Sequence, residues 1–249
     1  MNTLYATKTK VRPIEECYFY HTMEIPGHGR VEGEWDLTQA TSEYLGNVSF
    51  AGQRVLEVGP ASGYLSFEME KRGASVVSVD VGDEFVFDVV PFHGLDRKAL
   101  TDAFVATQKR VQNGYWLAHE ALNSKNQVYY GSGYKIPETL GKFDIGLLAS
   151  MLLHNSNPIM IADQVARLTT DKLIIVDLCH GNIAGAGDLP TIQLYPSAEN
   201  QIWHTWWRFS EKFFVELMKI LGFPKIEITR STQFYKTQPF TLHTIVGQR

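Results

Sequence analysis

The chain has 249 residues, of which 44% are hydrophobic and 20% are charged, and its net charge at pH 7 is −4. This balance favours a globular protein with a sizeable core and argues against a protein that coats nucleic acid, which would be basic or carry a basic stripe. Neither a run of about 18 apolar residues nor a signal-peptide core is present, and Cys17 and Cys179 form no disulfide framework, so we expect a cytoplasmic protein without a membrane partner.

Residues 1–34 have the irregular composition of an N-terminal arm, with several Pro and Gly residues. The aromatic run from Tyr18 to Tyr20, followed by His21, predicts that this arm packs over the domain, where His21 could reach a site. Trp35 and Asp36 are expected to open a helix that Asp36 caps, because apolar residues follow at helical spacing.

The next stretch predicts a strand, a tight turn and a helix. The apolar run Arg54 to Val58 is too short for a helix and breaks at Gly59 into a turn of small residues. A helix from Tyr64 to Arg72 and a strand from Ser75 to Asp80 follow. Asp80 comes about 20 positions after Gly59, where Rossmann-type folds place the carboxylate that binds ribose hydroxyls. The stretch therefore predicts the start of a nucleotide-binding βαβ unit.

The glycines in the turn indicate which cofactor is bound. A dinucleotide fingerprint needs glycines where this chain has Ala61 and Tyr64, so a ligand without a phosphate is favoured. The pattern Glu57-x-Gly59-x-x-x-Gly63 closely resembles the first motif of class I S-adenosylmethionine-dependent methyltransferases. The resemblance implies S-adenosyl-L-methionine as cofactor and S-adenosyl-L-homocysteine (SAH) as product. The residues that it assigns to the cofactor are Glu57, Gly59, Pro60, Ala61, Ser62, Gly63, Asp80 and Val81, and, after later strands, Ser132, Gly133 and Ser150.

An insertion at 82–126 separates the strand that ends at Asp80 from the next one, Gln127 to Tyr130, and is longer than a simple crossover needs. It predicts a loop, then a helix capped by Asp96, then a second helical stretch from Tyr115 to Leu122. Insertions beside the cofactor edge of a sheet commonly build a substrate pocket, and extra packing is the alternative.

The rest of the chain continues the α/β alternation. Strands are predicted at Phe143 to Ala149 and at Leu173 to Leu178, with a helix between them that has Asn157 as its cap. A lid-like loop at 181–208 precedes a helix capped by Ser210, and Lys225 to Thr229 and Thr241 to Val246 form a last strand pair. The resemblance implies an α/β fold: a Rossmann-like doubly wound seven-stranded sheet with an antiparallel last strand, in a single methyltransferase domain over 1–249.

Candidate groups for catalysis follow the strand ends, where ligands of open α/β sheets bind. His154 is the first choice for a general base or an orienting group, and His93 is the second, because histidine titrates near neutral pH. A hydrogen-bonded role in the turn is the alternative for His154. The substrate is expected to contact Phe92, His93, Trp116, Trp203, Trp206 and Trp207, and His180 is expected near the same crevice. The three tryptophans of the loop could instead anchor it to the core. No convincing metal-ligand spacing is present.

These features favour a methyltransferase that acts on oxygen or nitrogen of a small-molecule metabolite. One alternative is a tRNA-modifying methyl or carboxymethyl transferase, because the sequence from the paired tryptophans to Leu221-Gly222-Phe223 is somewhat similar to the family that alkylates wobble uridine. The acidic charge balance disfavours tRNA and argues against DNA as a partner. An NAD-dependent oxidoreductase and a non-catalytic cofactor-binding protein are the remaining alternatives. The sequence leaves the oligomeric state open.

Overall fold

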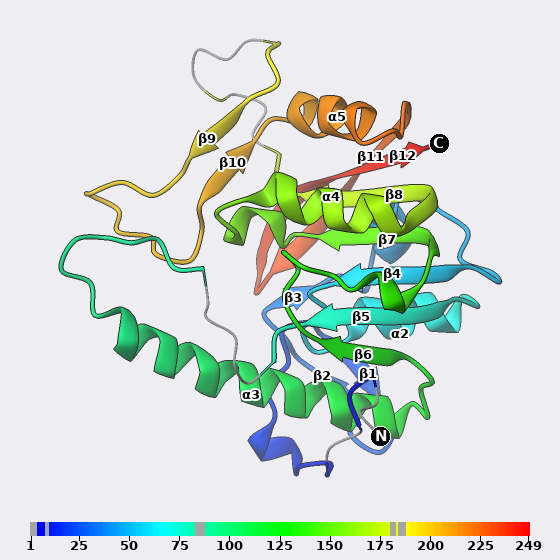
Figure 1. Ribbon diagram of the computed structural model, residues 1–249. Coiled ribbons are helices and arrows are strands. Elements are labelled where there is room, and N and C mark those ends of the chain that lie inside the picture. The colour runs from blue at the N-terminus through cyan, green and yellow to red at the C-terminus, as the bar shows by residue number, and fades with distance from the viewer. Residues whose placement is uncertain (1–3, 8–9, 83–87, 180–182, 184–187) are drawn as a thin grey trace.

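The computed structural model describes residues 4–7, 10–82, 88–179, 183 and 188–249. Its centre is a sheet of eight strands in the order β3-β11-β12-β8-β7-β4-β5-β6 (Figure 1). In that order the strands are β3 (Trp35–Asp36), β11 (Lys225–Tyr235), β12 (Gln238–Gln248), β8 (Thr169–Asp177), β7 (Phe143–Ala149), β4 (Arg54–Val58), β5 (Ser75–Asp80) and β6 (Gln127–Tyr130). The five strands from β8 to β6 are parallel, and β12 is antiparallel to β8. The predicted Rossmann-like sheet with its antiparallel last strand is therefore confirmed, with the short β3 as an eighth strand.

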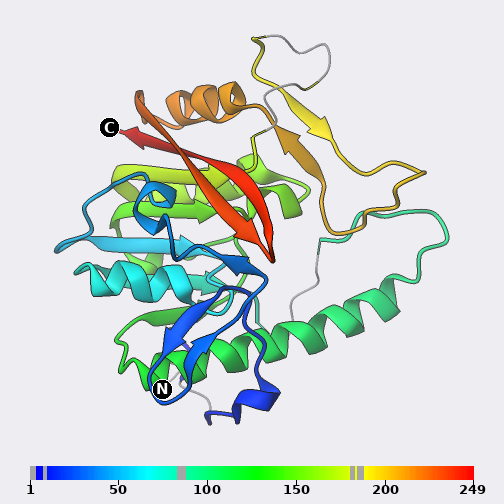
Figure 2. The same ribbon diagram turned by 180° about the vertical axis from the view of Figure 1, so that it is seen from behind.

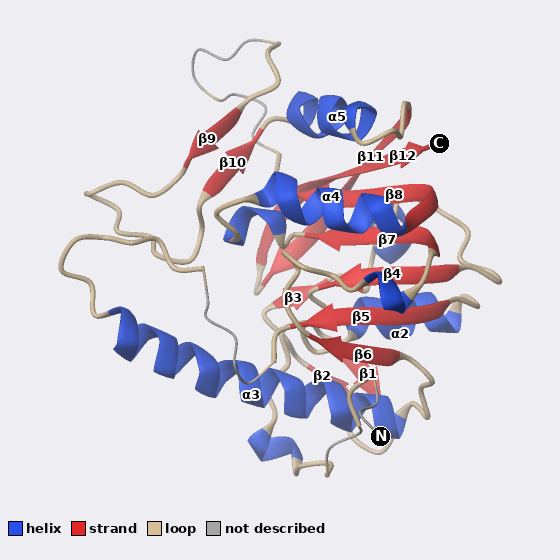
Figure 3. Ribbon diagram, viewed as in Figure 1, coloured by secondary structure: helices blue, strands red, loops and turns tan. Residues whose placement is uncertain are grey.

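Helices cover both faces of this sheet (Figure 3). The helices are α1 (Thr41–Tyr44), α2 (Tyr64–Lys71), α3 (Arg97–Ala121), α4 (Pro158–Leu168) and α5 (Glu211–Ile220), with 3-10 turns η1 (Ile14–Glu16), η2 (Glu138–Leu140) and η3 (Leu152–His154). Side chains of α2 and of the second half of α3 form one apolar cluster with alternate residues of the strands. Those of α4 and α5 form the other. Alternation along each strand sends successive side chains into the two layers.

Two further hairpins lie outside the main sheet. The first joins β1 (Met23–Ile25) to β2 (Gly29–Val31), and the second joins β9 (Ile192–Leu194) to β10 (Trp207–Phe209). The β9–β10 hairpin and the first half of α3 project beyond the carboxyl ends of β4, β5 and β7 (Figures 1 and 2). They flank the edge of the sheet at which open α/β folds bind their ligands.

The structure corrects four local expectations. No helix opens at Asp36: Trp35 and Asp36 form β3 and pair with β11, while the Asp36 carboxylate accepts the Thr38 N–H and closes a turn. The described part of the insertion has one continuous helix, α3, where two were expected. Gly114 of this helix allows the N-terminal arm to approach, because a Cβ there would lie 2.9 Å from the Tyr18 carbonyl oxygen. Two segments were expected to be irregular. Segment 1–34 contains β1 and β2, and segment 181–208 contains β9 and the start of β10.

Candidate active site

The turn between β4 and α2 has a backbone that suits glycine. Gly59, Ala61 and Gly63 have φ values of +79°, +49° and +90°, in the left-handed region. The Gly59 N–H donates to the Val79 carbonyl at 2.9 Å, which fixes the turn against β5. A Cβ at Gly63 would lie 2.6 Å from the Phe67 ring. Gly59 itself is exposed, so the backbone of the turn is open at the carboxyl edge of the sheet.

Glu57, in β4, stabilises this turn through hydrogen bonds to α2 and β5. Its carboxyl group is buried and accepts hydrogen bonds from the hydroxyls of Ser66, in α2, and Ser78, in β5, the latter at 2.8 Å. Burial raises the pKa of Glu57 to about 7, against the two hydrogen bonds that lower it. The side chain therefore ties strand, helix and neighbouring strand together beneath the turn.

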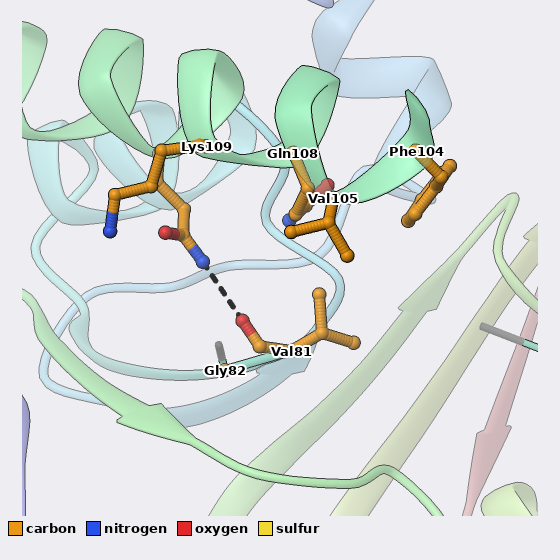
Figure 4. A pocket seen from close by; sticks show the side chains of 7 residues that line it. Val81, Gly82, Phe104, Val105, Gln108 and Lys109 are labelled. Atoms are coloured by element: carbon orange, nitrogen blue, oxygen red, sulfur yellow. Dashed lines mark hydrogen bonds between the residues drawn. The ribbon is translucent and has the colours of Figure 1, made fainter. Parts of the chain in front are cut away.

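Asp80 ends β5 beside the turn and is partly buried. Its carboxylate accepts the Val81 N–H at 2.9 Å, and the Gln108 amide of α3 lies 3.3 and 3.4 Å from its two oxygens. Burial raises the pKa of Asp80 to about 7. Gln112, one turn further along α3, donates to the Val81 carbonyl at 2.9 Å (Figure 4). Neither glutamine was predicted from the sequence as a site residue, although their i, i+4 spacing on a predicted helix places them on one face.

A small cavity lies next to Asp80, between α3 and the chain that follows β5 (Figure 4). The residues that line it are Val81, Gly82, Phe104, Val105, Gln108, Lys109 and Gln112. Its walls combine apolar side chains with two amides and Lys109, and its volume of about 20 Å³ has room for a water-sized group.

Ser62 faces the N-terminal arm. Its fully buried hydroxyl accepts the N–H groups of Tyr20 and His21, at 3.1 and 3.4 Å. The N-terminal arm therefore packs against the turn between β4 and α2, which is the arrangement that His21 needs in order to reach the site. Burial lowers the pKa of His21 to about 4, so its ring is neutral at pH 7.

The turns after β6 and β7 lie at the same carboxyl edge of the sheet. The Ser132 hydroxyl accepts the Tyr134 N–H at 3.2 Å, and a Cβ at Gly133 would lie 3.3 Å from the Val58 side chain, so this turn packs against the end of β4. Ser150 has a φ of +49°, and its hydroxyl lies 3.2 Å from the hydroxyl of Tyr44, a residue that the sequence analysis did not select for the site.

His154, at the end of η3, is held by one backbone carbonyl. Its Nδ1 lies 2.6 Å from the His204 carbonyl oxygen, which can only accept, so Nδ1 carries the proton and Nε2 is the basic nitrogen of the neutral ring. Burial lowers the pKa of His154, so the ring is neutral at pH 7. A neutral histidine with a fixed tautomer is suited to accept a proton at Nε2.

The segment from Trp203 to Trp207 is fastened to two other segments. The Trp206 indole N–H donates to the Asp88 carbonyl at 2.7 Å, and the Trp207 indole N–H donates to the Asn155 carbonyl at 2.9 Å. The Val90 N–H donates to the Trp203 carbonyl at 2.9 Å. These bonds join the loop that contains Phe92, the turn that contains His154 and the segment from Trp203 to Trp207. The indole N–H groups of Trp206 and Trp207 hold their own segment in place.

Asp88 is a further residue of this region that was not predicted from the sequence. Its carboxylate accepts the Tyr134 hydroxyl at 2.5 Å and the Ser156 N–H at 2.6 Å, so it joins the turn after β6 to the start of α4. Only its place in a loop rich in aromatic and acidic residues marked it in the sequence.

The other predicted residues lie in different surroundings. Phe92 is half-buried and His93 is exposed, beyond the Val90 contact. Trp116 is 4% exposed within the core and donates its indole N–H to the Tyr130 hydroxyl at 2.9 Å, away from the tryptophans of the loop. His180 and residues 83–87 lie outside the described residues.

Across the described residues, no helix is both long enough and apolar enough to cross a membrane. Within the same set, no three His, Cys, Asp or Glu side chains are grouped so that they could hold a metal ion.

No family model matches the chain, and no curated protein matches it in sequence. Solved structures do match it. The N-terminal domain of EvdMO1, in the presence of SAH and D-fucose, is 18% identical with a TM-score of 0.57, over 94% of this chain and 92% of that one. Magnesium protoporphyrin IX methyltransferase from Synechocystis PCC 6803, with bound SAM, is 14% identical with a TM-score of 0.50, over 85% of this chain and 77% of that one.

A third match is 1,6-didemethyltoxoflavin-N1-methyltransferase from Burkholderia thailandensis, with bound 1,6-didemethyltoxoflavin and S-adenosylhomocysteine. It is 13% identical with a TM-score of 0.52, over 85% of this chain and 77% of that one. At these identities the likeness establishes the fold: the chain has the Rossmann-like fold of these methyltransferases.

Proposed function

We propose that this protein is an S-adenosylmethionine-dependent methyltransferase that acts on a small molecule. The observation that carries the proposal is the position of the Asp80 carboxylate, at the carboxyl end of β5 beside the open Gly59 turn. An acid in that position can accept two hydroxyl donors of a ribose. The resemblance of the Glu57 to Gly63 motif and the ligands named for the structural neighbours point the same way.

The residues present fit such a cofactor. The exposed backbone at Gly59 would lie against the methionine part of the cofactor. Asp80 would bind the ribose, and the ribose hydroxyls would replace the long hydrogen bonds from the Gln108 amide to the Asp80 carboxylate. The turn at Ser132 and Gly133 is the candidate contact for the adenine. When bound, the cofactor supplies an activated methyl group, so the protein mainly aligns the acceptor and excludes water.

On the acceptor side we assign His154 the role of general base. Its Nε2 is the free, unprotonated nitrogen, because Nδ1–H donates to the His204 carbonyl. It would take the proton that an oxygen or nitrogen acceptor loses on methylation. Ser150 directly follows β7, four residues before His154. We assign Phe92, His93 and Trp203 to the rim of the substrate site, and Trp206 and Trp207 to its anchoring.

The small-molecule class rests on the charge of the chain and on the neighbours. Two neighbours are named as methyltransferases of magnesium protoporphyrin IX and of 1,6-didemethyltoxoflavin. An acidic protein with a net charge of −4 lacks the basic balance that binding of an RNA backbone requires.

The test is isothermal calorimetry with SAH and with NAD. We expect SAH to bind and NAD to give no heat, since Ala61 and Tyr64 replace the glycines that a pyrophosphate needs. Binding of NAD without any response to SAH would refute the proposal. A gel shift with unmodified tRNA at two salt concentrations tests the RNA alternative, and we expect no shift at either.

A further inference from the structure

Asp177, the last residue of β8, is a buried carboxyl group with one oxygen unpaired. It is 1% exposed, and its Oδ1 accepts the Leu178 N–H at 2.8 Å. Its Oδ2 is buried and has no hydrogen-bond partner among the residues that the structure describes. A buried carboxylate oxygen without a donor costs several kcal/mol in principle, so a site of this kind is normally completed by a partner.

The basic groups nearest to Asp177 along the sheet already have a partner. His243 of β12 lies directly opposite Asp177, and Arg230 of β11 lies opposite His243, so the three side chains share one face of the sheet. The His243 ring and the Arg230 guanidinium both bond Glu211 Oε2, at 2.7 and 2.6 Å. Both side chains therefore already have Glu211 as a partner.

Asp177 also lies close to the candidate site. The Ser150 N–H donates to the carbonyl of Val176, at 2.7 Å, which places the end of β7 against the end of β8. The Tyr44 hydroxyl lies 3.2 Å from the Ser150 hydroxyl, which brings Tyr44 to the same edge of the sheet, and the charge of Asp177 contributes to the raised pKa values of Tyr44 and Cys179. Burial raises the pKa of Asp177 itself to about 8, so it holds a proton at pH 7 unless a cation is bound.

We propose that Asp177 binds a protonated amine of the methyl-accepting substrate, with the hydroxyls of Tyr44 and Ser150 as flanking acceptors. An ammonium group has three N–H donors and a positive charge, which match one carboxylate oxygen and two hydroxyl oxygens. A neutral alcohol offers one donor and no charge. The inference rests on the proposed function and narrows its substrate class to amine-bearing small molecules.

The first test compares two probes that differ in charge. The protein, with and without saturating SAH, is titrated at pH 7 with benzylamine and with benzyl alcohol. We expect benzylamine to bind at least about tenfold more tightly, the smallest effect of a charge-assisted hydrogen bond. Asp177→Asn keeps an acceptor for the Leu178 N–H and should abolish the preference. Asp144→Asn is the control, since that carboxylate bonds the Arg54 N–H at the far end of β7. Equal affinities, no binding of either probe, or a preference that survives in Asp177→Asn would overturn the proposal.

A second measurement uses only the wild-type protein. Because Asp177 is protonated at pH 7, binding of an ammonium ion at its carboxylate releases a proton to the buffer, whereas binding of an alcohol releases none. Calorimetry in phosphate and in HEPES, whose ionisation enthalpies differ, measures this release, and benzylamine binding without it counts against Asp177. Failure of SAH to bind refutes the methyltransferase proposal, whereas SAH binding without an amine preference refutes only the role of Asp177.

Discussion

The half of the site built on β4 and β5 and the half built around His154 are assembled in different ways. Glu57 bonds Ser66 and Ser78, which are 9 and 21 residues away in the chain. His154 bonds the carbonyl of a residue 50 positions away, and the Trp206 indole that fastens the same segment reaches Asp88 across 118 positions. The first half belongs to one contiguous βαβ unit. The second forms only when several distant segments have folded together, so changes to the two halves should have separable effects.

The largest effect is expected from His154→Ala. A positioned general base contributes about 10²–10⁴-fold in rate, so turnover of the true substrate should fall by that factor, while SAH affinity stays within about twofold because the cofactor residues belong to the other half. His28→Ala, an exposed histidine of the β1–β2 hairpin, is the matched control.

The pH–rate profile gives an independent readout of the same residue. A base must be neutral, so activity should fall as pH falls through the pKa of His154, which burial places below its ordinary 6.5. This acid limb should be absent in His154→Ala. A folded variant with wild-type turnover and an unchanged limb would make His154 a structural residue of the turn.

The same contrast explains what the sequence could and could not predict. The bounds of β4, β5, β6 and β7 agree with the expected strands, because short apolar runs between turn residues encode them locally. Helix periodicity after Trp35 was misleading, because pairing of β3 with β11, some 200 positions away, overrides it. Asp88, Gln108 and Tyr44 escaped for a related reason: each acts through a partner that only the tertiary fold brings near.

Glu57→Gln should change how the stability of the cofactor half depends on pH. The folded protein raises the pKa of Glu57 from 4.5 to about 7, so the folded state holds this proton more tightly than the unfolded state. Its contribution to stability is complete below pH 4.5 and is lost as pH rises towards 7 and beyond, by on the order of 3 kcal/mol. Glutamine does not titrate, so this loss should disappear from the variant.

Urea denaturation at pH 5 and pH 8 measures the difference. The other buried carboxyls titrate in both proteins, so their contributions cancel when the two pH dependences are compared, except for Asp80, whose raised pKa is due in part to the charge of Glu57. The same loss of stability in wild type and Glu57→Gln would show that this carboxyl is not protonated in the folded state.

Asp80→Ala should weaken SAH binding by about 1.5–3 kcal/mol, or roughly 10- to 150-fold, because a charge-assisted hydrogen bond to the ribose is lost. Turnover at saturating cofactor should change far less, since the acceptor half is untouched. Asp102→Ala, an exposed aspartate of α3 paired with Lys98, controls for the loss of a charge. An unchanged dissociation constant in Asp80→Ala would remove Asp80 from the cofactor site.

The smallest effect, and the sharpest test of the comparison, comes from a pair of Trp→Phe variants. Trp206→Phe removes the indole donor to the Asp88 carbonyl in the acceptor half, and Trp116→Phe removes the donor to the Tyr130 hydroxyl in the core near β6. Each loses one hydrogen bond, so each should be destabilised by about 1 kcal/mol in thermal or urea unfolding.

The two variants should differ at His154. The backbone N–H of Trp206 donates to the Leu153 carbonyl, and the carbonyl of His204, two residues earlier, accepts the His154 Nδ1 proton. Loosening the Trp206 side chain should therefore let the ring exchange between tautomers, which the ¹⁵N shifts of its two nitrogens report, whereas Trp116→Phe should leave those shifts at wild-type values. If both variants move the His154 shifts equally, the halves are coupled through the core, and the separation drawn from their hydrogen bonds does not hold.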